Sequence, residues 1–353
     1  MQVIQTSSYP IIFKEEAYSH LNQIIRDRDY SMIALLVDEN THEKCAPAFL
    51  SKLEFEQKLE IIEISPGEEM KNLETVNTLW ELMTDFGMDR KSLLINLGGG
   101  VITDMGGFAA STFKRGIEFI NIPTTLLAMV DASVGGKTGI DLGVLKNQIG
   151  LFADPEMVLI DPEFLNTLEK RELTSGLAEV IKYGLTFDPG IWADFKNPQG
   201  VDLLKLIYQS IAIKNDVVQK DPKEQDVRKA LNYGHTLGHA IESFYLSSPL
   251  HSKMTHGEAI AIGMIAEAHL SFQMGYLQEE EILEIKQVIL NVFDHQSIST
   301  TDTPAIYEFL KHDKKNVGGN VNFVLLSQIG DFILNQRVSE AQMSEALNFY
   351  NLN

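Results

Sequence analysis

Three of the nine histidines, His235, His239 and His256, lie close together in the second half of the chain. His235 and His239 are four residues apart and therefore share one face of a helix, while His256 opens the next helical pattern. Neutral imidazoles are common ligands of zinc and similar divalent ions. The pattern is not the H-E-x-x-H motif of metalloproteases, because Thr236 stands where that motif has its catalytic glutamate. The spacing predicts a divalent metal site of another kind, and the alternative is a set of histidines that only pack.

A carboxylate ligand for this site has to come from elsewhere in the chain. Glu179 lies on an otherwise apolar helical segment, residues 176–183, with Lys182 one turn further on. Burying both charges is costly unless an ion or a ligand compensates them. Glu179 is therefore the best candidate, and an internal ion pair between Glu179 and Lys182 is the alternative.

A glycine-rich stretch, GGGVITDMGG at residues 98–107, follows an apolar run and opens a helical pattern. Glycines at such a turn let backbone N–H groups and the positive end of the helix meet a pyrophosphate. The stretch is not a regular G-x-G-x-x-G fingerprint, so a tight structural turn remains the alternative to nucleotide binding. Asp38 ends an earlier apolar run and can accept a hydrogen bond from an adenosine hydroxyl, although aspartates there are also common turn formers or helix caps.

Residues 131–138 end in Gly-Lys-Thr, as a Walker A motif does, but Asp131 occupies a position where that motif requires glycine. A carboxylate there would face the phosphates, so we do not expect an ATPase or a GTPase. The glycines instead let Lys137 approach a different anion. The further candidates for binding an anion, each of which is by default a solvated surface side chain, are Lys114, Arg115, Lys146, Asn147, Lys214 and Arg228.

Composition narrows the class of protein. The 353 residues are enough for about two domains of ordinary size, and 44% hydrophobic and 22% charged residues are typical of a globular chain. The net charge of -20 would repel nucleic acid and anionic membranes. The single cysteine, Cys45, cannot form an internal disulfide, and we see neither a signal peptide nor a membrane span. We therefore expect a cytoplasmic protein whose partner is a small molecule.

The elements that must position these residues change in character near Arg171. Before it, short β-rich runs alternate with a helical pattern at residues 73–83, and the runs lie at residues 33–37, 59–64, 93–97, 118–122 and 157–160. This order predicts a parallel sheet, in which ligands gather at the carboxyl ends of the strands. After it, long helical patterns cover residues 176–186, 203–220, 228–246 and 257–274, with one late strand at 321–326. We predict an α/β Rossmann-like amino-terminal domain, residues 1–172, and a mainly α-helical carboxyl-terminal domain, residues 173–353.

An ordered set of segments spanning nearly the whole chain closely resembles the 3-dehydroquinate synthase family of sugar phosphate cyclases. No single segment decides the match, but the set in this order is highly specific. The segments are PGEEMK (66–71), GGGVITD (98–104), PTTLL (123–127), DASVGGKT (131–138), KN (146–147), GLAEVIK (176–182), residues 231–242, HGE (256–258) and DKK (313–315).

The resemblance implies a fold, two cofactors and a reaction. The amino-terminal domain would carry NAD, and the helical domain would carry Zn²⁺ or Co²⁺. The substrate would be 3-deoxy-D-arabino-heptulosonate 7-phosphate, and the enzyme would be a lyase of the shikimate pathway. NAD would oxidise C5, phosphate would leave by elimination, C5 would be reduced again, and ring opening with an intramolecular aldol closure would give 3-dehydroquinate.

The resemblance also implies residue roles. The matching metal ligands are Glu179, His235 and His256, whereas His239 falls on a substrate-binding histidine, although spacing alone would make it a ligand. The matching NAD contacts are Asp38, Glu68, Lys71, Gly99, Gly100, Val101, Asp104, Thr124 and Thr125. The matching substrate contacts are Arg115, Lys137, Lys146, Asn147, Lys182, Lys214, Arg228, Asn232, His239 and Lys314, with Lys315 as an alternative to Lys314. The matching catalytic positions are Asp131, Lys137, Lys182, Lys214 and His239.

Arg115 matches an arginine that reaches the substrate phosphate of a neighbouring subunit, which implies a homodimer. The chain departs from the family at Thr103, usually Gly, where a hydroxyl could tighten the pyrophosphate turn, and at Asp141, usually Asn. We expect neither position to carry chemistry directly. No single residue is assigned as the general base, because the substrate phosphate can remove its own proton while the enzyme positions it.

Three other functions compete with this one. A sister cyclase would accept sedoheptulose 7-phosphate or glucose 6-phosphate, which lack a carboxylate. The resemblance places Lys214, Arg228 and the turn at residues 313–315 where a substrate carboxylate would bind, and these residues therefore argue against a sister cyclase. A metal-dependent alcohol dehydrogenase of related fold would release NADH. A non-catalytic NAD-binding sensor would have no chemical reason to keep the metal ligands and the basic residues.

Overall fold

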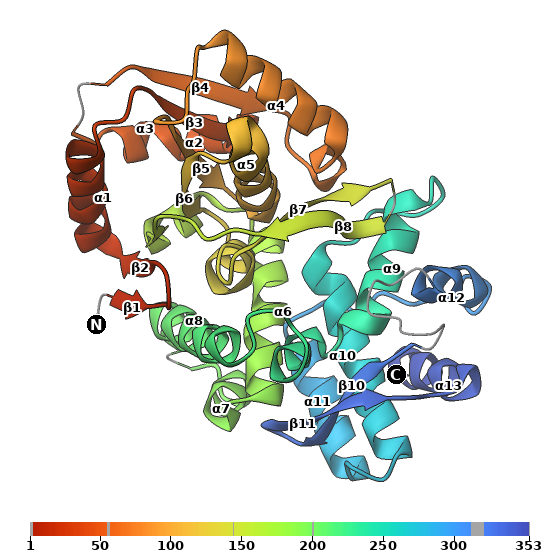
Figure 1. Cartoon of the computed structure of the whole chain (residues 1–353). Helices are drawn as coiled ribbons and strands as arrows, with labels where there is room; N and C mark the ends of the chain where they lie inside the picture. Colours follow the sequence, from red (N-terminus) through yellow and green to blue (C-terminus); the bar gives the residue numbers. More distant parts are fainter. Residues whose placement is uncertain (1–2, 55–56, 144, 200, 312–320, 353) are drawn as a thin grey trace. The chain divides into compact units, whose positions relative to one another are not determined.

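The computed structural model describes residues 3–54, 57–143, 145–199, 201–311 and 321–352. The chain forms two compact units, Met1–Leu173 and Thr174–Asn353 (Figure 1). Each unit has its own hydrophobic core, and helix α6 (Lys170–Thr186) runs from the first unit into the second.

The first unit is built on a seven-stranded sheet in the order β1-β2-β9-β6-β5-β3-β4. Every neighbouring pair is parallel except the edge pair β1 and β2. The strands are β1 (Val3–Gln5), β2 (Pro10–Phe13), β3 (Ile33–Asp38), β4 (Leu59–Ile64), β5 (Leu93–Gly98), β6 (Glu118–Pro123) and β9 (Val158–Ile160). Strands β5 and β9 are buried along their whole length, as their continuous apolar runs predict for a parallel sheet covered on both faces.

Helices and a hairpin complete the first unit. The α-helices are α1 (Lys14–Arg28), α2 (Glu39–Lys44), α3 (Ala46–Leu50), α4 (Leu73–Asp85) and α5 (Gly100–Thr112). Short helical turns are η1 (Glu68–Met70), η2 (Phe113–Arg115), the π-helical η3 (Ala128–Ala132) and η4 (Pro162–Thr167). Strands β7 (Lys137–Leu142) and β8 (Leu145–Phe152) form a separate antiparallel hairpin.

The second unit is mainly helical. Its elements after α6 are α7 (Pro189–Lys196), α8 (Leu203–Lys220), η5 (Val227–Asn232), α9 (His235–Ser247), α10 (His256–Gln273), α11 (Glu279–Leu290), α12 (Thr303–Lys311), β10 (Phe323–Gln328), β11 (Asp331–Gln336) and α13 (Glu340–Asn351). Helix α10 is buried over most of its length because its sequence is apolar on all sides. It therefore forms the centre of this unit.

The predicted fold class is confirmed, and the structure adds two features. The helical pattern predicted over residues 228–246 is interrupted at Gly234, whose φ of 78° separates η5 from α9. The late strand lies at β10, and it pairs with a second strand, β11, that the sequence analysis did not predict.

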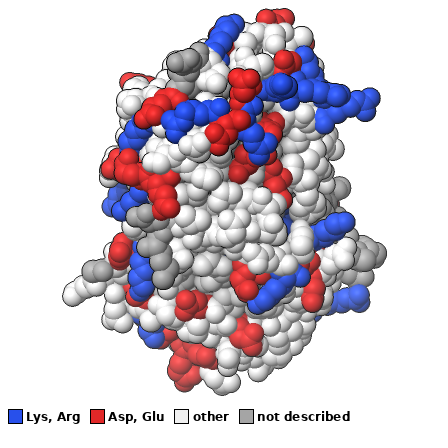
Figure 2. Space-filling view, turned by 60° about the vertical axis from the view of Figure 1, so that its left-hand side comes forward, with Lys and Arg blue, Asp and Glu red and all other residues white. Residues whose placement is uncertain are grey.

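Basic and acidic side chains are interspersed on the face drawn in Figure 2. Within the described ranges, no helix is both long and apolar enough to cross a bilayer.

Candidate functional site

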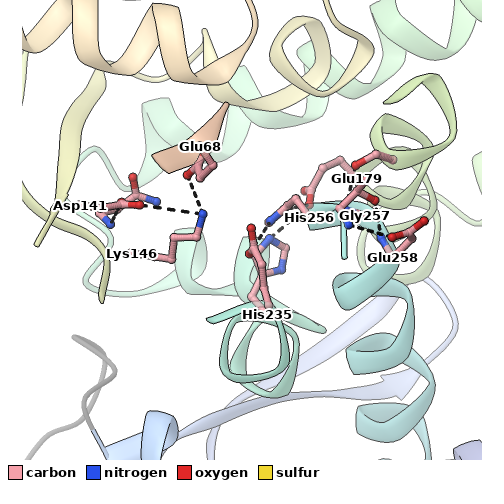
Figure 3. A network of polar contacts seen from close by, with 12 residues as sticks. Glu68, Asp141, Lys146, Glu179, His235, His256, Gly257 and Glu258 are labelled. Carbon is pink, nitrogen blue, oxygen red and sulfur yellow. Dashed lines mark hydrogen bonds and ion pairs between the residues drawn. The ribbon is translucent and has the colours of Figure 1, made fainter. Parts of the chain in front are cut away.

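Three helices of the second unit bring a carboxylate and three imidazoles together. Glu179 comes from α6, His235 and His239 from α9, and His256 from α10. The Oε1 atom of Glu179 lies 3.2 Å from Nε2 of His235 and 3.2 Å from Nε2 of His256 (Figure 3). The ring nitrogens of His235, His239 and His256 can offer one ligand atom each within 4.8 Å of one another. Four possible donors from distant parts of the chain thus converge.

Close helix contacts set this geometry. A Cβ on Gly257 would lie 2.1 Å from the carbonyl oxygen of Ser175, so α6 and the start of α10 meet backbone to backbone. The hydroxyl of Ser175 also accepts a hydrogen bond from the Gly257 N–H at 2.9 Å. Glu179 lies one helical turn after Ser175, and His256 directly precedes Gly257. This crossing therefore places the carboxylate beside the imidazole.

Each of the two nearest histidines is oriented through its other nitrogen. Nδ1 of His235 lies 2.9 Å from the carbonyl oxygen of Tyr233, and Nδ1 of His256 lies 3.2 Å from Oε2 of Glu242. Partners of this kind fix the ring orientation and leave Nε2 available to a metal ion. Glu242, which the sequence analysis did not select, could have been found from its spacing, because it lies seven residues after His235 on the same helix face.

Glu179 is a fully buried charge with cationic neighbours. Its carboxylate contacts the ammonium of Lys182, which is itself only 1% exposed. Burial alone would raise the pKa of Glu179, but Lys182 and the two histidines hold it well below its usual value. Burial lowers the pKa of His235, against the pull of Glu179. Burial would also lower the pKa of His256, but Glu242 and Glu179 raise it to about 10.

The donor set fits a zinc-like ion. A tetrahedral ion with bonds of about 2.0–2.2 Å separates its donor atoms by about 3.3–3.6 Å. The two 3.2 Å separations between Glu179 Oε1 and the histidine nitrogens are close to this value. A carboxylate with imidazoles is also the donor chemistry that such ions prefer in catalytic sites. The ion pair of Glu179 with Lys182 is present as well, so the two interpretations made from the sequence are not exclusive.

In the first unit, the residues expected at NAD follow the carboxyl ends of four adjacent strands. Asp38 ends β3, Glu68 follows β4, and Gly99 follows β5. Thr124 follows β6, and its N–H donates to the carbonyl of Gly98 at 3.0 Å. Because parallel strands end at one edge, these residues share the edge at which α/β proteins bind nucleotides.

The glycine turn between β5 and α5 is closely packed. A Cβ on Gly98 would lie 2.5 Å from the Ile102 side chain, and one on Gly99 would lie 3.0 Å from that of Thr125. No side chain of its own caps the start of α5, since Gly99 is the N-cap. The Thr103 hydroxyl donates to the carbonyl oxygens of Gly99 at 3.4 Å and of Gly100 at 3.3 Å, so its side chain contacts the first turn of α5. Val101 is the second residue of α5.

Asp38 is also a helix cap. Its Oδ1 accepts the Thr41 N–H at 2.8 Å, and the Thr41 hydroxyl in return accepts the Asp38 N–H at 2.9 Å. Asp38 therefore has the helix-capping role that the sequence analysis considered, and it also lies at the carboxyl edge of the sheet.

A buried lysine joins two of the predicted groups of site residues. Nζ of Lys71 donates to Oδ2 of Asp104 and to Oδ1 of Asn147, at 2.6 Å each. Burial alone would lower the pKa of Lys71, but the carboxylates of Asp104, Glu68 and Asp141 raise it. Predicted NAD contacts and a predicted substrate contact thus meet at one ammonium group.

A second lysine continues this network. Nζ of Lys146 donates to Oε1 of Glu68 at 2.6 Å and lies 3.9 Å from Oδ2 of Asp141 (Figure 3). Asp141 also accepts the Asn147 N–H at 2.6 Å, and its N–H donates to the Lys71 carbonyl at 2.8 Å. Burial raises the pKa of Asp141, against the pull of Lys71 and Lys146. Asp141 of β7 therefore holds the start of β8, which carries Lys146 and Asn147.

The structure also agrees with the rejection of a P-loop. Asp131 lies in η3, and Lys137 begins strand β7 after Gly135 and Gly136, whose φ values are 98° and 67°. A P-loop lysine would instead lie at the start of a helix.

The remaining predicted residues occupy separate elements of the second unit. Lys214 is buried on α8, and Arg228 is buried in η5, where its guanidinium donates to the Pro222 carbonyl at 2.7 Å. Asn232 ends η5 and donates to Oε1 of Glu224 at 2.6 Å. Lys314 and Lys315 lie outside the described residues.

Comparisons with known proteins place this geometry in context. Residues 61–175 match the family model for the amino-terminal part of 3-dehydroquinate synthase, and residues 176–316 match the model for its carboxyl-terminal part. The 3-dehydroquinate synthase of Parabacteroides distasonis is 41% identical over 349 residues, which is 98% of each chain.

Two solved structures are similar over 99% of this chain. A 2-deoxy-scyllo-inosose synthase in complex with carbaglucose-6-phosphate, NAD⁺ and Co²⁺ has a TM-score of 0.82 and 26% identity, with 99% of that chain covered. A 2-epi-5-epi-valiolone synthase from Streptomyces hygroscopicus with NAD⁺ and Zn²⁺ has a TM-score of 0.83 and 25% identity, with 98% of that chain covered.

Proposed function

Because the chain belongs to the 3-dehydroquinate synthase family, we propose that it converts 3-deoxy-D-arabino-heptulosonate 7-phosphate to 3-dehydroquinate and phosphate. The strongest support from the geometry is the convergence of one Glu179 oxygen on the Nε2 atoms of His235 and His256. The enzyme is a lyase that uses NAD and a divalent metal ion within each turnover. We place it in the cytoplasm, where reducing conditions suit a chain whose Cys45 is a buried free thiol.

Glu179, His235 and His256 would hold Zn²⁺ or Co²⁺. Such an ion, when bound, raises the acidity of the hydroxyl groups it contacts. Tyr233 and Glu242 keep the two imidazoles oriented, and Lys182 neutralises the Glu179 oxygen that faces away from the histidines. His239 lies beside this set on α9, one turn after His235, and we assign it to the substrate because it matches a substrate-binding histidine of the family.

NAD would bind at the carboxyl edge of β4, β3, β5 and β6. The pyrophosphate would lie on the glycine turn at the start of α5, where backbone N–H groups and the helix dipole favour an anion. Asp38 would favour NAD over NADP, because a 2′-phosphate would meet a carboxylate. When bound, NAD would supply the reversible oxidation of the substrate at C5. The proposed contacts are Asp38, Glu68, Lys71, Gly99, Gly100, Val101, Asp104, Thr124 and Thr125.

The substrate carries a carboxylate and a phosphate, and the basic side chains suit both. Lys137, Lys146, Asn147, Lys182, Lys214, Arg228, Asn232, His239 and Lys314 would hold it, with Asp131, Lys137, Lys182, Lys214 and His239 near the reacting groups. Holding both ends of the substrate in one orientation supplies much of the catalysis in such a reaction.

Arg115 would serve the neighbouring subunit of a homodimer. Lys114, Arg115 and Gly116 have consecutive positive φ values of 48°, 73° and 110°. Non-glycine residues adopt this conformation at a cost, and such strain gathers at functional sites. Hydrogen bonds hold the turn, from Arg90 to the Lys114 carbonyl and from Lys114 to the Met88 carbonyl, while Arg115 itself is exposed.

Product analysis tests the function. Zn²⁺-loaded protein is incubated with catalytic NAD and 3-deoxy-D-arabino-heptulosonate 7-phosphate, and phosphate, 3-dehydroquinate and NADH are followed together. Equal amounts of phosphate and 3-dehydroquinate without net NADH are expected. Turnover only of a carboxylate-free sugar phosphate would indicate a sister cyclase, and stoichiometric NADH would indicate a dehydrogenase.

Mixed dimers test the role of Arg115. Arg115→Ala, which should have weakened phosphate handling, is mixed with His235→Ala, which should be inactive. Recovery of activity in the mixture is expected, because one of the two sites in a mixed dimer then has all its groups. Absence of any recovery, with mixed dimers shown to form, would contradict sharing between subunits.

A further inference from the structure

Helix α9 carries His235 and His239, but its N-cap residue is a glycine and has no side chain that could cap the helix. The N-cap is Gly234, with φ of 78°, and no side chain at that position accepts a hydrogen bond. The first N–H groups of a helix have no partner within the helix, and burying them unpaired is costly. His235 is the first residue of α9, so the order of this turn decides where its imidazole lies.

A carboxylate from another helix supplies the missing cap. Glu267 of α10 accepts the Gly234 N–H through Oε2 at 2.6 Å, and the Thr236 and Leu237 N–H groups through Oε1 at 3.2 Å each. Its side chain is 0% exposed. A negative charge at this end also favours the dipole of α9. One fully buried carboxylate thus holds three N–H groups on both sides of His235.

Glycines allow this carboxylate to reach α9. A Cβ on Gly263 would lie 1.9 Å from the Gly234 carbonyl oxygen, and one on Gly238 would lie 2.7 Å from the Ile260 side chain. Gly263 and Glu267 are four residues apart and share one face of α10. The backbones therefore approach closely, and Glu267 meets the first turn of α9 directly.

Helices α9 and α10 are thus joined at two places, with the glycine contacts between them. At one end Glu242 of α9 contacts His256, and at the other Glu267 holds the start of α9. His256 and Glu267 are eleven residues apart, which is about 16 Å along a helix and returns to the same face. A slip of one helix along the other would change the distance from His235 to His256, and the two contacts oppose it.

We propose that Glu267 is a positioning residue of the metal site, which fixes the first turn of α9 so that the His235 imidazole faces Glu179 before the ion binds. The inference rests on the proposed metal site and assigns no contact between Glu267 and the ion or the substrate. It predicts that losing the carboxylate weakens metal binding and changes the geometry of the bound ion in protein that is still folded.

Glu267→Gln tests this in the full chain. The amide keeps the size of the side chain but can offer one acceptor oxygen instead of two. Zn²⁺ affinity is measured in competition with a chromophoric chelator, and the visible absorption of the Co²⁺-loaded protein reports its ligand geometry. We expect Zn²⁺ affinity to fall by about ten- to a hundredfold, as for other outer partners of metal ligands, and the Co²⁺ bands to shift.

Ser271→Ala is the matched control. Ser271 is 0% exposed and lies one turn further along α10, where its hydroxyl donates to the Glu267 backbone carbonyl at 2.8 Å and accepts from the Leu326 N–H of β10 at 3.0 Å. It does not contact the Glu267 carboxylate through either bond, so Ser271→Ala changes the same part of α10 and leaves that carboxylate in place. We expect it to lower the melting temperature without changing Zn²⁺ affinity or the Co²⁺ spectrum. Wild-type affinity and spectrum in Glu267→Gln, or equal changes in both variants, would overturn the role of Glu267. Wild-type protein that binds no Zn²⁺ would instead overturn the proposed metal site itself.

Amide hydrogen exchange in the wild-type protein tests the inference even if Glu267→Gln fails to fold. In metal-free protein, the amides of Gly234, Thr236 and Leu237 should already be protected, because Glu267 holds them without the ion. Exchange as fast as in exposed loops, with protection appearing only after Zn²⁺ is added, would overturn it.

Discussion

Glu179→Gln should remove tight metal binding and also destabilise the metal-free protein. Glutamine has nearly the same shape, but it lacks the charge that faces His235 and His256 on one side and Lys182 on the other. Lys182 is 1% exposed, so its ammonium would remain buried without this carboxylate. Breaking a buried pair by removing one partner costs about 3–5 kcal/mol. For a unit of the size of Thr174–Asn353, at about 2–4 °C per kcal/mol, the melting temperature should fall by about 6–20 °C.

The assay measures unfolding and metal content together. Melting curves are recorded with chelator and with excess Zn²⁺, and bound zinc is counted after dialysis. Metal affinity should fall by more than the about 10–100-fold that loss of an outer partner costs, because a direct ligand is lost. His239→Ala is the control, since His239 belongs to the same histidine group but is proposed to bind substrate. It should keep its zinc and lose activity.

The opposite pattern would refute the assignment. If Glu179→Gln retained zinc with wild-type affinity while His239→Ala lost it, the three histidines would be the ligands and Glu179 would be only the partner of Lys182. A fall in melting temperature of less than about 2 °C with chelator would show that Lys182 does not depend on this carboxylate.

Three further predictions concern other parts of the chain. Gly263→Ala should separate α9 from α10 and abolish zinc binding, because its Cβ would lie 1.9 Å from the Gly234 carbonyl oxygen; zinc content after purification checks this. Lys71→Met should weaken NAD binding by about 1.5–3 kcal/mol, because a hydrogen bond to a charged group contributes about this much, and it should leave the zinc content unchanged. Calorimetric titration with NAD measures this change. Wild-type affinity for NAD would show that Lys71 and its partner Asp104 do not belong to the cofactor site. Burial raises the pKa of the Cys45 thiol, so at pH 8 a smaller fraction of it is thiolate than in an ordinary cysteine. Iodoacetamide should therefore label Cys45 slowly in the native protein and quickly in urea. Equal labelling rates would contradict its burial.

Much of this protein is encoded locally in its sequence. Apolar runs that end at turn residues predicted β3 to β6, and helical periodicity predicted α6, α8 and α10, because both patterns follow from which faces must be buried. The ordered segments from residues 66–71 to residues 313–315 were sufficient to identify the family. The hairpin partner β11 was not predicted, because its apolar residues alternate too weakly and are only partly buried.

Other features depend on contacts between distant segments. Spacing within α9 grouped His235 with His239, whereas the helix crossings bring Glu179, more than fifty residues earlier, to within 3.2 Å of His235 and His256. Sequence analysis gave Asp141 no direct role and did not select Glu267. In the fold, Asp141 holds the start of β8, which carries Lys146, and Glu267 caps a helix other than its own. The periodicity of apolar residues indicates which face of a helix or strand is buried, but not which other element packs against that face. The role of a buried carboxylate depends on the N–H groups and cations that this packing brings next to it.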